Sequence, residues 1–153
     1  MESIHLSDYL DLNAISLELQ AGTKDKVLEE LVALLNIDPE SKNIALELVR
    51  SREALGSTGI GKEVAIPHLR STIFSQITLV YGRSLKGIDF GAVDGKPVRH
   101  FFLVASPPID PSNLYHPILA KIVQLIRLPK NRKRLGEIDS KAELLNLIDE
   151  LAS

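Results

Sequence analysis

"REALGSTGIGKEVAIPH", residues 52–68, joins the end of a helical pattern to a short run of strand-forming residues. Gly56, followed after four residues by Gly61 and Lys62, begins like the phosphate loop of a nucleotide-binding protein. Such a loop needs Ser or Thr next to hold Mg²⁺, and Glu63 stands there instead. A phosphate loop also follows a strand and opens a helix, which is the reverse of the order here. The stretch therefore argues against ATP or GTP binding.

Two interpretations of this stretch remain. In the first, Gly56 closes the preceding helix, a plain turn follows, and His68 is a satisfied core histidine. In the second, Pro67 stiffens the backbone and presents His68 at the end of a strand, beside groups that bind phosphate. Those groups would be the guanidinium of Arg52, the hydroxyls of Ser57 and Thr58, and the backbone amides of Gly59 and Gly61.

The second interpretation defines a reaction class. A neutral imidazole is a good nitrogen nucleophile near pH 7, and transfer of a phosphoryl group depends mostly on positioning and charge stabilisation. The four histidines, at positions 5, 68, 100 and 116, have no metal-ligand spacing, so we expect neither a metal ion nor a cofactor. His100, in an apolar run, is expected in the core or at a strand edge. The stretch thus indicates phosphoryl transfer through a phosphohistidine.

Outward from this stretch, helical and strand patterns alternate, which predicts one α/β layered domain over residues 1–153. Pro117 predicts that the third helix becomes regular there and leaves His116 just before its first turn. Thr23 or Gly22, Pro39 and Ser140 mark helix starts, and Asp94-Gly95 marks a tight turn. Helices are predicted over 24–35, 39–55, 111–128 and 140–152, and strands over 15–19, 63–69, 76–84 and 98–106.

The composition fits a soluble cytoplasmic protein that binds neither nucleic acid nor membranes. Of the 153 residues, 44% are hydrophobic and 25% charged, and the net charge of −2 gives no basic surface overall. There is no cysteine, no signal-peptide pattern and no apolar run long enough to cross a bilayer. The one basic run, "RLPKNRKRL" (127–135), is either a solvated helix end or a docking patch for an acidic partner.

The stretch at 52–68 resembles the active-site motif of the type 2 IIA domains of the bacterial phosphoenolpyruvate-dependent phosphotransferase system (PTS). This is the fructose/mannitol family, which includes the nitrogen-regulatory IIA proteins. The similarity extends to "GIDFGAVDGKPVRHFFLVASP" (87–107) and "HPILAKIVQLIR" (116–127), and so covers nearly the whole chain. The resemblance implies a mixed, mostly parallel sheet flanked by helices on both faces.

The resemblance also assigns roles. His68 matches the histidine that accepts a phosphoryl group from an HPr-type phosphocarrier, His116 matches the family's second histidine, and Arg52 matches the motif arginine. A IIA protein passes the group to a cysteine-bearing IIB domain for sugar transport, or acts as a regulator whose phosphorylation state selects its partners. Because the chain ends at Ser153 with no IIB or membrane segment, the expectation leans to the nitrogen-regulatory type.

Two positions depart from the family pattern. Glu63 stands where the family usually has glycine, and Leu69 stands where it usually has a small residue. A carboxylate at 63 is expected to weaken phosphate affinity. Leu69 is expected to lie with Ile60 beside His68, on an apolar surface that a partner covers.

Overall fold

The two longest strands form the centre of the sheet. In the computed structural model, which describes residues 4–110 and 113–152, β5 (Thr78–Ile88) pairs antiparallel with β6 (Val98–Ser106). Almost every residue of β6 is buried, as expected for an apolar run covered on both faces. These strands carry the core, to which Tyr81, Phe101 and Phe102 contribute large, fully buried side chains.

Short strands extend this pair on both sides. β1 (Ile15–Ser16) pairs parallel with β5, while β3 (Val64–Ala65) and β4 (His68–Arg70) both pair parallel with β6. β2 (Gly59–Gly61) adds an antiparallel edge to β3, which gives the order β1-β5-β6-β3-β2. Three of the five pairings are parallel. The predicted mixed, mostly parallel sheet is confirmed, although its longest pairing is antiparallel.

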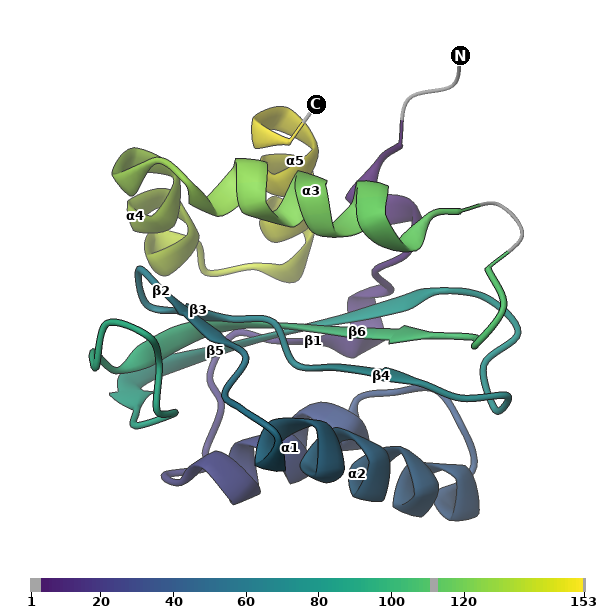
Figure 1. The fold of residues 1–153 in the computed structure, drawn as a ribbon. Helices are drawn as coiled ribbons and strands as arrows, with labels where there is room; N and C mark the ends of the chain where they lie inside the picture. The colour runs from purple at the N-terminus through teal and green to yellow at the C-terminus, as the bar shows by residue number, and fades with distance from the viewer. Residues whose placement is uncertain (1–3, 111–112, 153) are drawn as a thin grey trace.

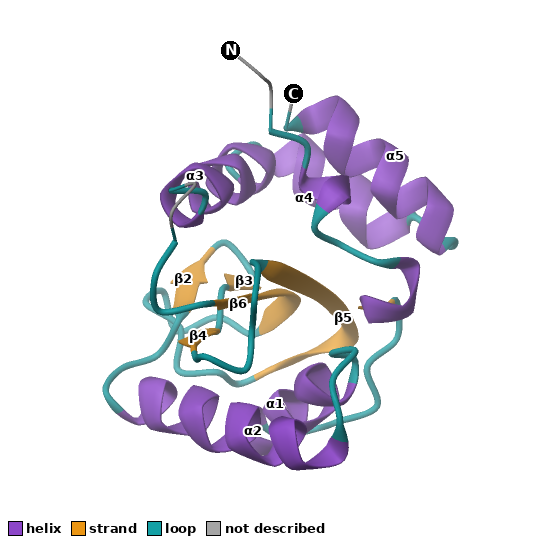
Figure 2. Cartoon of the chain, turned by 90° about the vertical axis from the view of Figure 1, so that its right-hand side faces the viewer, coloured by secondary structure: helices purple, strands orange, loops and turns teal. Residues whose placement is uncertain are grey.

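Helices cover both faces of the sheet (Figure 1). α1 (Lys24–Ala33) and α2 (Pro39–Ala54) pack below it, and the other three helices pack above it. Figure 2 shows the sheet between these two layers. No helix in the described ranges is long and apolar enough to span a membrane. The upper layer contains α3 (Tyr115–Ile126), α4 (Pro129–Glu137) and α5 (Lys141–Leu151). Two short 3-10 helices, η1 (Leu6–Asp8) and η2 (Leu12–Ala14), precede β1.

The helix starts follow the predicted caps. The side chains of Thr23 and Ser140 accept backbone hydrogen bonds at the first turns of α1 and α5. Pro39 occupies the first turn of α2, where Asp38 is the N-cap. Helix α3 begins at Tyr115, so His116 lies inside its first turn, and the prediction that it precedes that turn is wrong. A proline within the first turn lacks only an N–H that has no helical partner, so Pro117 does not delay the start.

The basic run at 127–135 is largely a solvated helix, which agrees with the first of its two interpretations. This helix, α4, is separate from the predicted helix over 111–128, which the sequence pattern did not show. Pro129 holds Leu128 in an extended conformation, which ends α3, and then occupies the first position of α4. Arg132 donates from Nη1 to the carbonyl groups of Ile126 and Arg127 and so caps the end of α3.

Candidate active site

His68 begins β4 and is half-buried. Its Nδ1 lies 3.1 Å from the carbonyl oxygen of Ile66, and its Nε2 accepts a hydrogen bond from Nε of Arg52 at 3.1 Å. Because a carbonyl oxygen only accepts, Nδ1 must carry the proton, and Nε2 then keeps its lone pair. The hydrogen bonds therefore assign the tautomer whose Nε2 is the nucleophilic nitrogen.

Arg52 is fixed by two contacts. It stands in the last turn of α2, and its Nη1 donates to the carbonyl oxygen of Gly56 at 2.7 Å. That carbonyl follows the helix end, where the amide of Gly56 donates to the carbonyl of Glu53. Gly56 therefore closes α2, as predicted, and its carbonyl group holds Arg52 beside His68.

A pocket of about 330 Å³ opens beside the imidazole. Arg70 and Tyr115 line it with His68, and the guanidinium carbon of Arg70 lies 4.1 Å from the centre of the Tyr115 ring. That ring stands edge-on to His68, with centroids 6.3 Å apart. Burial raises the pKa of the Tyr115 hydroxyl, so it stays protonated at neutral pH. Arg52 at Nε2 and Arg70 on the wall of the same pocket thus supply two guanidinium groups, which suits an incoming phosphoryl group.

Sequence reasoning missed Arg70 and Tyr115. Arg70 could have been predicted from the sequence, because residues two apart in a strand lie on the same side of the sheet and Arg70 is two residues after His68. Nothing in the sequence pattern pointed to Tyr115. Its place is set by the start of α3, where its amide donates to the carboxylate of Asp110 at 2.8 Å.

His116 is exposed, and its ring stands 5.4 Å from that of Tyr115. Within residues 4–110 and 113–152, no hydrogen bond or ring contact joins His116 to His68. Tyr115 contacts both rings. The catalytic role predicted for His116 stays a prediction, and the contacts indicate an indirect effect through Tyr115.

The predicted phosphate donors of residues 57–61 already have partners. The hydroxyl of Ser57 donates to the carbonyl of Phe90 and accepts from the amide of Gly59. The hydroxyl and the amide of Thr58 both donate to the carboxylate of Glu53. Ser57, Thr58 and Gly59 would have to exchange these partners to bind a phosphoryl group, so their role stays a prediction.

The glycines of this loop have structural reasons to be glycine. A Cβ on Gly59 would lie 2.8 Å from the Cβ and 2.9 Å from the Cα of Ala92. Gly61 has φ of 90° at the entrance to the turn between β2 and β3. Its phosphate-binding role stays a prediction. Close packing and turn geometry therefore explain both positions without a ligand.

Glu53 is the anchor of the loop. It is buried, with 6% of its surface exposed, and its carboxylate accepts from Thr58 and pairs with the ammonium group of Lys24 at 2.9 Å. Lys24 also donates to the carbonyl of Phe90 and lies over that ring. One carboxylate thus joins α1, the end of α2 and the loop that precedes His68.

We expect Glu53→Ala to destabilise the protein by about 1–3 kcal/mol, because the buried donors of Thr58 lose their acceptor. Denaturant unfolding measures this change. The matched control is Glu29→Ala, which removes a carboxylate from ion pairs whose side chains are at least 38% exposed and should cost about 0–1 kcal/mol. Equal losses in the two variants would contradict the anchoring role of Glu53.

The turn at Glu63 has a backbone conformation that favours glycine, so the glutamate there is an unfavourable choice for the backbone. Lys62 has φ of 57° and Glu63 φ of 66°, a left-handed pair typical of a two-residue hairpin turn, where glycine is favoured. The Glu63 carboxylate compensates by pairing with Nε of Arg99 at 3.1 Å, and Asp94 accepts from the amide of Lys62. The side chain of Glu63 is therefore held at the turn by Arg99.

The expectation that Leu69 lies on an exposed apolar surface is wrong. Leu69 lines the pocket beside His68, but only 4% of its surface is exposed, whereas Ile60 is 42% exposed. A partner that covers His68 therefore has little of the Leu69 side chain to contact. The predicted place of Ile60 beside His68 stays a prediction.

His100 is a core histidine, as predicted, with 3% of its surface exposed. Its Nδ1 lies 2.7 Å from the hydroxyl of Tyr81. Burial, followed by the charges of Arg83, Arg99 and Arg132, lowers the pKa of His100 to about 4. This imidazole therefore stays neutral at physiological pH.

A pH effect on stability follows. The folded-state pKa of His100 is below the usual value near 6.5, so the unfolded chain binds the proton first as pH falls. The free energy of unfolding should therefore fall between pH 6.5 and 4, with about 3 kcal/mol coming from His100. Unfolding measured across this range should show a shallower pH slope in His100→Gln, while exposed His5→Gln keeps the wild-type slope. Identical slopes in all three proteins would contradict the assignment.

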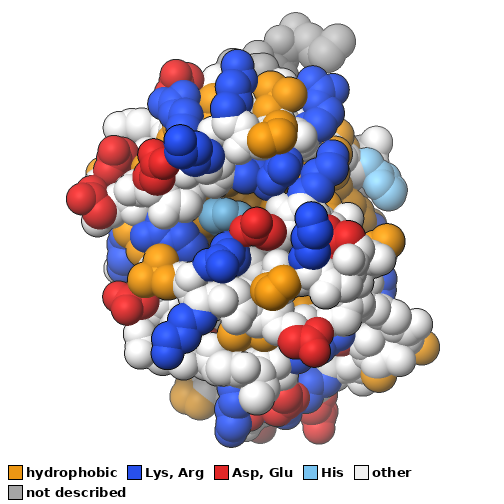
Figure 3. All heavy atoms as spheres, turned by 90° about the vertical axis from the view of Figure 1, so that its left-hand side faces the viewer, with side chains coloured by type: hydrophobic (Ala, Val, Ile, Leu, Met, Phe, Trp, Pro, Cys, Tyr) orange, Lys and Arg blue, Asp and Glu red, His pale blue; other side chains and the backbone are white. Residues whose placement is uncertain are grey.

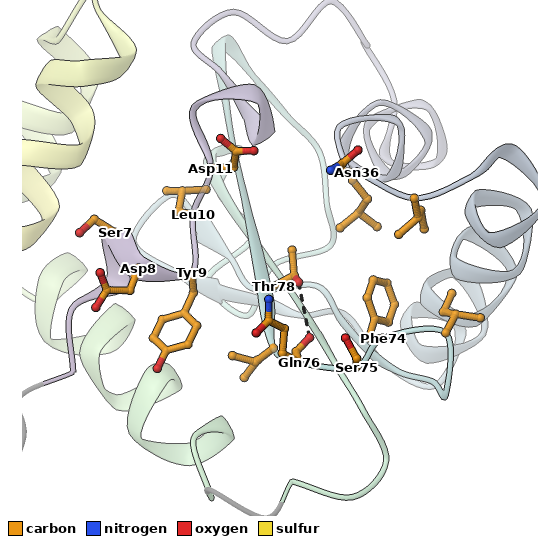
Figure 4. Close-up of a pocket in the computed structure, with 14 residues that line it drawn as sticks. Ser7, Asp8, Tyr9, Leu10, Asp11, Asn36, Phe74, Ser75, Gln76 and Thr78 are labelled. Atoms are coloured by element: carbon orange, nitrogen blue, oxygen red, sulfur yellow. Dashed lines mark hydrogen bonds between the residues drawn. The ribbon is translucent and has the colours of Figure 1, made fainter.

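A larger hollow lies away from His68. It has a volume of about 630 Å³ and is bounded by η1, the link between α1 and α2, and residues 73–78 (Figure 4). The described residues that line it include Asp8 and Asp11 and no Lys or Arg, so it does not suit an anionic substrate.

A family model described as "Phosphoenolpyruvate-dependent sugar phosphotransferase system, EIIA 2" matches residues 8–151. The chain therefore belongs to the type 2 IIA family of this phosphotransferase system. The fold and the family predicted from the sequence are both confirmed.

Relatives carry two kinds of name. The "PTS system fructose-specific EIIA component" of Haloferax volcanii is 29% identical over 99% of each chain. The "PTS system fructose-specific EIIABC component" of Bacillus subtilis is 26% identical over 95% of this chain, which spans only 23% of that protein. The crystal structure of nitrogen regulatory protein IIA-Ntr from Neisseria meningitidis superposes with a TM-score of 0.85 at 31% identity, covering 94% of this chain and 98% of that one. Sugar transport and nitrogen regulation are thus both represented.

Proposed function

We propose that the protein is a phosphoryl carrier that accepts a phosphoryl group on Nε2 of His68 from an HPr-type phosphocarrier. The observation that carries this proposal is the pair of hydrogen bonds to the imidazole. One fixes the proton on Nδ1, and the other places a guanidinium beside the free lone pair.

The transfer step would proceed as follows. Nε2 attacks the phosphorus of the donor's phosphohistidine, a new P–N bond forms, and the donor's P–N bond breaks with its electron pair left on the donor nitrogen. The proton of His68 stays on Nδ1, where the carbonyl of Ile66 supports the positive charge that develops on the ring. Arg52 would turn from Nε2 to the phosphoryl oxygens, and Arg70, on the rim of the pocket, would add a second cation.

The acceptor would be either a IIB cysteine or a regulated protein. The chain itself has no cysteine, so the next covalent carrier must be another domain or protein. We favour regulation, in line with the likeness to the Neisseria regulatory protein, and keep sugar transport as the second candidate because the full-length Haloferax relative is fructose-specific.

The proposal is tested by mixing the protein with a phosphorylated HPr-type carrier and recording the intact mass. We expect one phosphoryl group per chain, lost in acid and kept in alkali, as for phosphohistidine. Absence of uptake from a carrier that phosphorylates another IIA protein in the same experiment would refute the proposal.

The two roles are separated by the fate of the phosphoryl group. A phosphoryl group adds about 1.5–2 negative charges beside His68, if phosphohistidine behaves like phosphorylated hydroxyl residues. For regulation, pull-downs with phosphorylated, unmodified and His68→Ala protein should retain different partners. For transport, a IIB domain should remove the group and pass it to sugar in the presence of membranes. Identical partners in all three pull-downs would exclude regulation.

A further inference from the structure

Arg83 is a buried cation that forms no ion pair among the described residues. It lies on β5 with 7% of its surface exposed, and its guanidinium donates to the carbonyl oxygens of Leu17, Leu135 and Ile138 at 2.7–3.0 Å. No carboxylate in the described part of the chain forms an ion pair with it. A buried charge that only carbonyl groups solvate is costly, so a counter-ion at this position would stabilise the fold.

A small pocket of about 130 Å³ opens beside this guanidinium. It lies where the second half of β5, the start of β6 and α4 meet, and none of the described residues that line it carries a carboxylate. Figure 3 shows this end of the molecule, on which Lys and Arg side chains gather over the upper half. The lining residues are Arg83, Ser84, Leu85, Arg99, His100 and Gly136.

His100 supplies a donor at the same place. The hydroxyl of Tyr81 occupies Nδ1, and Nε2 has no hydrogen-bond partner among residues 4–110 and 113–152. When Tyr81 donates to Nδ1, Nε2 carries the proton and donates. Burial lowers the pKa of this imidazole, and the nearby positive charges of Arg83, Arg99 and Arg132 lower it further. These three charges favour an anion at the pocket.

We propose that this pocket binds one phosphate-sized oxyanion, held by the guanidinium groups of Arg83 and Arg99 and by Nε2–H of His100. Arg99 is shared with Glu63, so an anion would compete with that half-exposed carboxylate. A tetrahedral oxyanion fits about 130 Å³, several times the roughly 30 Å³ that one water occupies in the liquid, whereas a nucleotide does not. The ligand is free inorganic phosphate or the phosphate group of a small metabolite.

The test is an NMR titration of protein with isotopically labelled histidine, at constant ionic strength, with inorganic phosphate in one arm and glycerol phosphate in the other. The His100 signals are expected to shift to saturation, in wild type and equally in a His68→Ala variant. The second protein separates this pocket from the candidate active site. Tighter binding of glycerol phosphate would identify a metabolite as the source, and tighter binding of inorganic phosphate would identify the free ion.

Two variants test whether Arg99 contributes to phosphate binding. Arg99 is 43% exposed at its side chain, so Arg99→Gln should fold, and we expect its affinity for phosphate to fall about tenfold or more through loss of a charge-assisted hydrogen bond. Arg50→Gln, whose guanidinium pairs with Asp25 and Glu29 on the opposite helical layer, should bind as wild type. A wild-type protein whose His100 signals do not saturate with either anion overturns the proposal, as does equal affinity in Arg99→Gln. Neither outcome bears on phosphoryl uptake by His68.

Discussion

The His68→Ala variant is expected to take up no phosphoryl group from a phosphorylated HPr-type carrier. The variant removes the nucleophilic Nε2, and within the described residues no other nitrogen is held in the same arrangement beside Arg52. The alanine protein should still fold, because His68 is only half-buried and β4 keeps its backbone pairing with β6. Transfer is measured with radiolabelled donor and by intact mass.

The matched control is His5→Ala, which removes an exposed histidine from the start of η1. It should accept the phosphoryl group at the wild-type rate. Label that persists on His68→Ala would place the carrier residue elsewhere, and His116 would be the first position to examine.

Arg52→Ala is expected to slow transfer by about 10²–10³-fold, the usual cost of losing one preorganised donor to a transition-state oxygen, or roughly 2.7–4 kcal/mol. Arg70 remains on the pocket rim, so we expect the lower end of this range. Arg52→Lys keeps the charge but cannot contact Nε2 of His68 and the carbonyl of Gly56 together, so it should recover only part of the rate. Single-turnover transfer, followed in a quench-flow instrument, gives these rates.

Two further variants are compared with Arg52→Ala. Arg50→Ala removes a guanidinium from the same helix, two residues away, where it pairs with Asp25 and Glu29, and should leave the rate unchanged. His116→Ala should have a smaller effect than Arg52→Ala, because its ring contacts Tyr115 and not His68. Wild-type transfer in Arg52→Ala would remove this arginine from the mechanism.

Much of the fold could be predicted because many strands and helix starts are determined by residues close together in the sequence. The apolar run of β6 and the caps at Thr23 and Ser140 depend on neighbouring residues alone, and the structure agrees with each. The separate helix α4 was missed. Pro129 ends α3 and also occupies the first position of α4, and the spacing of apolar residues does not show that a second helix starts there.

The site was predicted where the motif is contiguous and missed where it is not. Arg52 and His68 lie in one stretch, and the structure joins them by a hydrogen bond. Tyr115 reaches the pocket only because α3 crosses above β4, which no short stretch encodes. Glu53 was visible in the motif, but its role as an anchor depends on Lys24 of α1, a contact between distant segments.

The most direct test of the account is the position of the phosphorus atom on the phosphorylated protein. Protein labelled with ¹⁵N at histidine and phosphorylated by its donor should show phosphorus coupled to Nε2 of His68, with the proton retained on Nδ1 beside the carbonyl of Ile66. Coupling to Nδ1 of His68, or to either nitrogen of another histidine, would contradict it.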